Sequence, residues 1–369
     1  MEEIQNPFAR PEKKPKNKKI WKILGLTVLI IFLVIVIFNF LSSKIGSSGS
    51  LVFESLSGYP QSSLSNKSYG VIYFAENKWH VEINKKKNSY DLAPVMVSVS
   101  DRGSGYVYLE NGQWQASING KTYGPHQMIS DLSVSGNNFG YVYLENGQWH
   151  VNINGKNYGP YNYILEKNMK VSENNFGYAY QKDGQWYVNI NGKDSGPYQN
   201  VSAVSLFESG YGYSFQKNNQ WKVNINGKEY GPYTNIISLT VANKKFGYVY
   251  DNQGKQYANI NGKTYGPYDV LSLLSISESS FGFAIFSEGQ WKVNINGKDQ
   301  GSYSAVKDVS VSGNKFGFIY QEEGKWKAKI NNKVFGPYEN IDNLSVFESN
   351  FGFSYQDQGK MFFTVNPVK

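Results

Sequence analysis

Charged side chains recur at fixed intervals along most of this 369-residue chain. A lysine follows a tight turn about every 35 residues, and these lysines are Lys86, Lys121, Lys156, Lys193, Lys228, Lys263, Lys298 and Lys333. Acidic residues recur at a second position, namely Asp101, Glu173, Glu208, Glu278 and Glu348. Repeated lysines and carboxylates suit electrostatic docking to an anionic polymer or a protein, although lysine is also an ordinary solvated residue of turns.

The chain offers little material for catalysis or for a metal centre. It has no cysteine and three histidines, which excludes disulfides, iron–sulfur clusters and thiolate zinc sites. His80 and His150 each follow a tryptophan, and both are expected to be replaceable surface residues. Calcium-loop, zinc-protease and serine-hydrolase motifs do not occur. We therefore predict no catalytic residue, no metal and no cofactor.

The net charge of +8 does not indicate a nucleic-acid partner. Residues 1–22 carry seven bases and three acids, so half of the excess lies in a short tail. Arg10 and Arg102 are the only arginines, whereas nucleic-acid sites favour the bidentate guanidinium group. Asp101-Arg102-Gly103 is the one irregular loop, and Arg102 is a candidate for a specific contact.

These charged residues belong to an internal repeat of about 35 residues that fills residues 51–369. The repeat is marked by one position, occupied by Trp79, Trp114, Trp149, Trp186, Trp221, Gln256, Trp291, Trp326 and Met361. A glycine stands nine residues before each of these, from Gly70 to Gly352. Nine units therefore form one repetitive domain rather than two or three separate ones.

Each unit is predicted to contain four short strands, which we call A to D. In the clearest unit these are residues 132–135, 139–145, 148–153 and 156–161. Asn146-Gly147 predicts a two-residue B–C turn because both of its residues favour positive φ. That turn would place Gly140 opposite Ile153 and the tryptophans on the apolar face, where core packing is favoured over stacking on sugars. Tyrosines on the other face are expected to pack between units through hydrogen-bonded hydroxyls.

The pattern predicts an all-β propeller of four-stranded blades. Strand D carries proline in six units, which suits an outer edge, and strand A alternates small residues such as Ser133, which suits crowding around an axis. The last unit lacks strand D, and residues 51–59 resemble that missing strand, so they are expected to close the ring. An open solenoid would need polar caps instead. Nine blades are predicted, with eight as the alternative.

The units resemble the TolB/WD40-like β-propeller repeats of bacterial proteins. The shared features are a tight turn before an aromatic-led strand, an NGK-type turn and a Gly-Pro stretch, as in residues 139–161. The WD dipeptide itself is absent. The resemblance implies the propeller fold and a bacterial envelope setting, but it does not imply one activity.

Residues 23–43 are uncharged and almost wholly apolar, and as a helix they would span about 30 Å, which is enough to cross a bilayer. The basic residues 1–22 predict a cytoplasmic N-terminus, and residues 44–50 would link the anchor to an exported propeller. A cleaved signal peptide is the rival interpretation, but its apolar region is shorter.

Together these features predict a single-pass membrane protein. Its extracytoplasmic propeller is expected to act as a non-catalytic binding or scaffold module for an envelope protein or glycan. An exported hydrolase of glycans or peptides is an alternative, with Asp101 and Glu166 as the acids to test. A TolB-like subunit of an envelope assembly is another.

Overall fold

The computed structural model describes residues 50–56, 60–208 and 210–367. The chain divides into two units, residues 1–45 and residues 46–369, and the description concerns the second unit. No helix among the described residues is long and apolar enough to cross a membrane. The predicted tail (1–22), the anchor (23–43) and all of the linker (44–50) except residue 50 lie outside these residues, as do residues 57–59 of the predicted closing strand.

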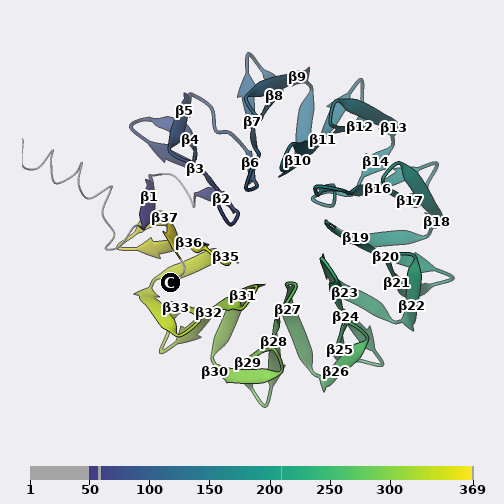
Figure 1. The fold of residues 1–369 in the computed structure, drawn as a ribbon, viewed down its shortest axis with the longest axis vertical. Coiled ribbons are helices and arrows are strands. Elements are labelled where there is room, and N and C mark those ends of the chain that lie inside the picture. Colours follow the sequence, from purple (N-terminus) through teal and green to yellow (C-terminus); the bar gives the residue numbers. More distant parts are fainter. Residues whose placement is uncertain (1–49, 57–59, 209, 368–369) are drawn as a thin grey trace, which may run out of the picture. The chain divides into compact units, whose positions relative to one another are not determined.

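Nine antiparallel sheets stand around a common centre, each with strand A innermost and strand D outermost (Figure 1). The A strands are β2 (Gln61–Leu64), β6 (Met96–Val99), β10 (Met128–Ser135), β14 (Tyr163–Ile164) with β15 (Lys170–Val171), β19 (Asn200–Phe207), β23 (Asn235–Ala242), β27 (Val270–Ile276), β31 (Ala305–Ser312) and β35 (Asn340–Val346). The B strands are β3 (Tyr69–Ala75), β7 (Ser104–Glu110), β11 (Asn138–Glu145), β16 (Phe176–Lys182), β20 (Gly210–Lys217), β24 (Lys245–Asn252), β28 (Phe281–Ser287), β32 (Lys315–Glu322) and β36 (Asn350–Asp357).

The outer half of each sheet has the same regularity. The C strands are β4 (Lys78–Ile83), β8 (Gln113–Ile118), β12 (Gln148–Ile153), β17 (Gln185–Ile190), β21 (Gln220–Ile225), β25 (Lys255–Ile260), β29 (Gln290–Ile295), β33 (Lys325–Ile330) and β37 (Lys360–Pro367). The D strands are β5 (Lys86–Tyr90), β9 (Lys121–His126), β13 (Lys156–Tyr161), β18 (Lys193–Tyr198), β22 (Lys228–Tyr233), β26 (Lys263–Tyr268), β30 (Lys298–Tyr303), β34 (Lys333–Tyr338) and β1 (Leu51–Ser55). The structure is therefore a propeller of nine four-stranded blades, and the eight-bladed alternative is wrong.

The strand register within a blade is the predicted one. Asn146 and Gly147 have positive φ, and Gly140 stands opposite Ile153 across β11 and β12. A Cβ atom on Gly140 would lie 2.7 Å from Ile153 Cδ1 and 2.8 Å from Met169 Sδ of the next blade. Glycine is required at this position because two neighbouring sheets approach each other there.

The D strands that carry proline lie at the outer edge of their sheets, as predicted, since each pairs only with its C strand. The small residues of the inner strands connect neighbouring blades. The Ser133 hydroxyl accepts a hydrogen bond from Val171 N–H at 3.1 Å, and Ser98 accepts one from Val134 N–H at 3.1 Å. The same bond joins Ser205 to Val241, Ser275 to Val311 and Ser310 to Val346.

Aromatic side chains fill the spaces between blades. Tyr161 of one D strand contacts Tyr178 and Tyr180 of the next blade's B strand, with ring centroids 5.9 and 4.1 Å away. The hydroxyls of Tyr161 and Tyr178 lie 2.8 Å apart, which confirms the predicted hydroxyl bonds between units. The tryptophans are half-buried and pack against the apolar cores, as Trp149 does beside Val151. These contacts make each blade depend on its neighbours.

The two ends of the chain meet in the ninth sheet. The strand β1 pairs with β37 along its whole length, with Phe53 opposite Phe363, and it is the outermost strand of that blade. Phe53 is 9% exposed and contacts Tyr69 and Tyr73 of the first blade at centroid distances of 5.5 and 5.6 Å. The core at this junction therefore contains residues from both ends of the repeat.

Candidate binding face

Strand polarity assigns the turns to two faces of the propeller. Adjacent strands are antiparallel, so the A–B and C–D turns share one end of each sheet, and the B–C turns and D–A connections share the other. We call the end with the A–B and C–D turns the lysine face, and the other end the B–C face. In the third blade, Phe139 N–H donates to Asn154 Oδ1 at 2.8 Å, which ties the C–D turn to the start of strand B.

All eight predicted lysines are exposed on the lysine face, each as the first residue of its D strand. Four of these ammonium groups lie 5.0–5.1 Å from the centre of the ring two residues further on: Lys156 over Tyr158, Lys228 over Tyr230, Lys263 over Tyr265 and Lys333 over Phe335. None of the eight lysines makes an ion pair with another described residue. The structure thus places eight equivalent ammonium groups around one face.

The five predicted acids are also exposed on this face, in the A–B turns closer to the axis. They partly link neighbouring turns. Lys67 N–H donates to Asp101 Oδ1 at 3.0 Å, and Asn243 donates to Glu278 Oε1 at 3.2 Å. Glu348 N–H donates to Asn66 Oδ1 at 3.0 Å across the junction of the ninth and first blades.

The remaining predicted residues form similar links. Arg102 makes an ion pair with Glu173, and this hydrogen bond raises the pKa of the guanidinium group. Asn175 donates to the backbone carbonyl of Glu208 at 3.1 Å. The irregular loop at Arg102 therefore joins turns of non-adjacent blades, because its partner lies two blades further along the chain. These links give the predicted acids a structural use besides any contact with a ligand.

Two inner-strand carboxyl groups were not singled out by the sequence. Asp131 Oδ2 accepts a hydrogen bond from Met169 N–H at 3.2 Å, and Asp308 Oδ2 accepts one from Leu344 N–H at 3.1 Å. Burial raises the pKa of Asp131, and burial raises the pKa of Asp308 to about 6. Asn168 occupies the equivalent place in the fourth blade and accepts from Val204 N–H. Since an uncharged amide accepts the same hydrogen bond, this position connects neighbouring blades and does not require a group that can ionise.

The expectation that His80 is a surface residue is wrong. His80 is 2% exposed, and its Nδ1 and Nε2 atoms lie 2.9 Å from Ser89 Oγ and from the Ala75 carbonyl oxygen. The first blade lacks a Gly-Pro pair, so β5 pairs with β4 without a bulge and Ser89 stands directly opposite His80. Desolvation lowers the pKa of His80.

The other two histidines, His126 and His150, pack on the same tyrosine ring. His150 is half-buried and stacks on Tyr143 with centroids 5.1 Å apart, and His126 packs on the same ring at 4.1 Å. Both ring nitrogens of His126 are buried without a hydrogen-bond partner among the described residues, and burial lowers its pKa. Within the same residues, no group of three or more histidine or carboxylate side chains could hold a metal ion.

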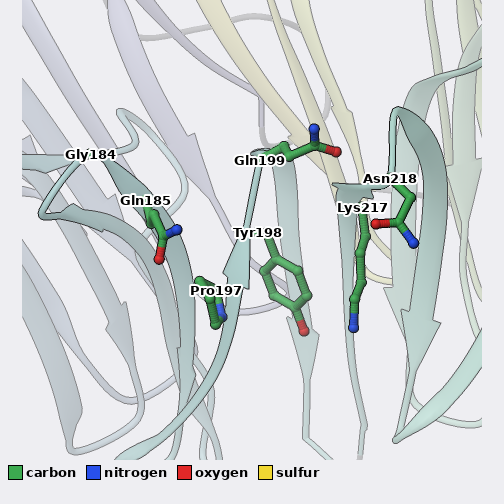
Figure 2. Close-up of a pocket in the computed structure, with 7 residues that line it drawn as sticks. All are labelled: Gly184, Gln185, Pro197, Tyr198, Gln199, Lys217 and Asn218. Carbon is green, nitrogen blue, oxygen red and sulfur yellow. The ribbon is translucent and has the colours of Figure 1, made fainter.

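An open cleft lies on the B–C face between the fourth and fifth blades (Figure 2). It has a volume of about 510 Å³ and is lined by Gly184, Gln185, Pro197, Tyr198, Gln199, Lys217 and Asn218. Lys217 is its only charged lining residue. No sequence pattern distinguishes this site, since its residue types recur between other blades.

Comparisons with known proteins identify no family for this chain. No protein-family model and no curated protein matches the chain. The β-propeller domain of the Trilobed protease from Pyrococcus furiosus is 13% identical over 77% of this chain and 97% of that one, with a TM-score of 0.39. Hsv2 from Kluyvelomyces marxianus is 9% identical over 75% of this chain and 99% of that one, with a TM-score of 0.41.

A third solved structure, apo AztD from Citrobacter koseri, is 9% identical over 78% of this chain and 94% of that one, with a TM-score of 0.38. At these identities and TM-scores the likenesses support no conclusion about this chain. The number of blades and the ring junction rest on this chain's own strand pairing. Membership of the TolB/WD40-like family stays a prediction.

Proposed function

We propose that this chain is a membrane-tethered binding or scaffold module that lies outside the cytoplasm and holds an envelope protein or glycan without catalysing a reaction. The observation that supports it best is the repetition of one exposed lysine at the same place in eight blades. Equivalent cations around a rigid ring suit a partner whose negative charges also repeat. Several weak contacts made at once give such a module its affinity.

The same face favours binding over hydrolysis. A hydrolase of glycans or peptides needs an acid and a base that converge on one substrate. Asp101 lies in the A–B turn of the second blade, whereas Glu166 lies between β14 and β15, part-way along the inner strand of the fourth blade, so the two acids share neither a turn nor a blade. Turnover of an envelope polymer that is lost in Asp101→Asn or Glu166→Gln would support the hydrolase instead.

The proposal is tested by capture from envelope extracts with the full chain in detergent. One variant replaces Lys193, Lys228 and Lys263 by Glu on the lysine face. The matched control replaces three exposed lysines of the B–C turns, Lys182, Lys217 and Lys325, by Glu. Both variants change the net charge equally, so a general loss of positive charge affects them alike.

We expect a protein or glycan to be retained by the unchanged chain and by the control variant, and to be lost from the first variant. Equal retention by both variants would contradict the assignment to the lysine face. Recovery of no partner at any salt concentration would contradict the binding function itself. Co-purification with a multi-subunit envelope complex would favour the TolB-like assembly role.

A further inference from the structure

The chain enters the propeller at the lysine face. The strand β1 begins at Leu51 opposite Val365, and Ser50 donates a hydrogen bond to Asn366. Residues 366 and 367 pair with the start of β36, directly after the last A–B turn. Since β1 is antiparallel to β37, it starts at the lysine face and ends at the B–C face. The described part of the chain therefore begins, at residue 50, at the edge of the lysine face.

The predicted linker between the apolar segment and β1 is short. It comprises residues 44–50, and seven residues reach about 25 Å when fully extended. If residues 23–43 cross a bilayer, the point where β1 begins stays within that distance of the lipid surface. The tether attaches to one face only, so that face meets the lipid more readily than the opposite face does.

The turns of the two faces differ in their balance of charge. All eight C–D turns that lead into a described D strand from β5 to β34 are followed by a lysine. The A–B turns beside these lysines add the five acids named above. The B–C turns carry an acid in eight blades, namely Glu76, Glu110, Glu145, Asp183, Asp251, Glu288, Glu322 and Asp357, and they also carry Lys78, Lys182, Lys217, Lys255, Lys325 and Lys360. A module with an excess of lysines on one face and a mixture of acids and lysines on the other is oriented by a negatively charged surface.

We propose that the lysine face lies against the bilayer and that its lysines bind the headgroups of anionic phospholipids. This inference rests on the membrane tether of the proposed function. It identifies anionic phospholipids as the nearest negatively charged molecules that the lysine face would meet. The tether keeps that face at a high effective concentration of headgroups, whereas a wall polymer would have to enter the narrow space between face and lipid. The B–C face then points away from the membrane, and the protein or glycan of the proposed function would compete with the headgroups for the lysine face.

The absence of cysteine makes the orientation measurable with single labels. Lys156→Cys labels the lysine face, and Glu145→Cys labels the B–C face of the same blade. Both positions are exposed, and they lie at opposite ends of the strand β12, which is about 20 Å long. The full chain carrying a donor dye is reconstituted in nanodiscs with an acceptor dye on the lipid headgroups. Energy transfer is compared between zwitterionic discs and discs containing phosphatidylglycerol.

We expect transfer from position 156 to exceed transfer from position 145 by at least about twofold at this separation. Phosphatidylglycerol should increase transfer from position 156, and about 1 M salt should abolish that increase because it shortens the screening length to about 3 Å. Lys193→Glu, Lys228→Glu and Lys263→Glu together should also remove the increase. Lys182→Glu, Lys217→Glu and Lys325→Glu should leave it, and unchanged melting temperatures would show that both variants are folded.

The other outcomes separate this inference from the proposed function. Equal transfer from both positions, or no effect of phosphatidylglycerol, would overturn the inference while leaving the tether intact. No incorporation into nanodiscs would overturn the tether and with it the proposed function. Retention of an isolated anionic wall polymer on the lysine face, without any response to lipid charge, would assign the lysines to that polymer and overturn the lipid contact.

Discussion

Phe53→Ala tests whether β1 holds the ring closed. The Phe53 side chain is 9% exposed and lies between the ninth and first blades, where its ring contacts Tyr69, Tyr73 and Phe363. Truncating a buried phenylalanine removes its transfer free energy and leaves a cavity, which together cost about 3–5 kcal/mol. The sheets on both sides of the junction are held in place by their other neighbours, so they cannot move together to fill the cavity. The loss of stability should therefore lie near the upper end of this range.

A second phenylalanine supplies a matched control. Phe207 is 39% exposed at the end of β19, so Phe207→Ala removes the same atoms from a place about four times as exposed as that of Phe53. Exposed substitutions of this kind cost less than about 1 kcal/mol. The difference between the two variants therefore measures burial at the junction and not the change of residue type.

The assay is urea unfolding of the full chain in mild detergent, followed by tryptophan fluorescence. Phe53→Ala should lower the free energy of unfolding by several times as much as Phe207→Ala does. Deleting residues 51–55 should cost more than Phe53→Ala, since it also removes the backbone pairing with β37. If Phe53→Ala and Phe207→Ala shift the urea midpoint equally, β1 does not stabilise the closed ring and the reasoning fails.

Three further substitutions test contacts between blades, each by the free energy of unfolding. Gly140→Ala should cost about 1–3 kcal/mol because its Cβ would lie 2.7 Å from Ile153 Cδ1; a neutral result would mean that the blades separate easily. Ser133→Ala should cost about 1–2 kcal/mol because it leaves a backbone N–H of the next blade without its acceptor, and no loss would mean that water replaces the hydroxyl. Asp308 has a folded-state pKa of about 6, above its unfolded value, so stability should fall by about 1–3 kcal/mol as pH rises from about 4 to 7. Asp308→Asn, which copies the amide of Asn168, should flatten that part of the pH profile, and parallel profiles would refute the assignment.

The features that repeat were predictable from the sequence. An Asn-Gly turn restricts a hairpin to one register, so the pairing of Gly140 with Ile153 followed from the position of two residues. Proline lacks an N–H group, which explains why strand D lies at the outer edge. The tyrosine hydroxyl bonds between blades, such as that of Tyr161 with Tyr178, followed from aromatic positions on the second face of the hairpin.

Features that depend on a single blade were not predictable. His80 looked replaceable because lysine or glutamine occupies its place elsewhere, yet the missing Gly-Pro pair brings Ser89 opposite its ring. The sequence predicts small residues on the inner strands. The role of the inner serines as acceptors for the next blade depends on how two neighbouring sheets are shifted relative to each other, and the sequence does not show that shift. The pairing of Arg102 with Glu173 joins turns 71 residues apart, and no local pattern reports such a distance.

Repetition also determines how loss of binding should appear. Eight equivalent lysines share the charge of one face, so the removal of any single lysine should weaken binding to an anionic surface only slightly. Successive removals should weaken it by similar steps, because exposed charges of this kind act nearly independently. Ring closure behaves differently, since each blade boundary is filled by its own aromatic side chain, Phe53 against Tyr69 at the junction and Tyr158 against Phe176 between the third and fourth blades, and one boundary cannot compensate for another. Stability of this propeller should therefore be sensitive to a single substitution at a blade boundary, whereas its binding face should tolerate the change of any one of its residues.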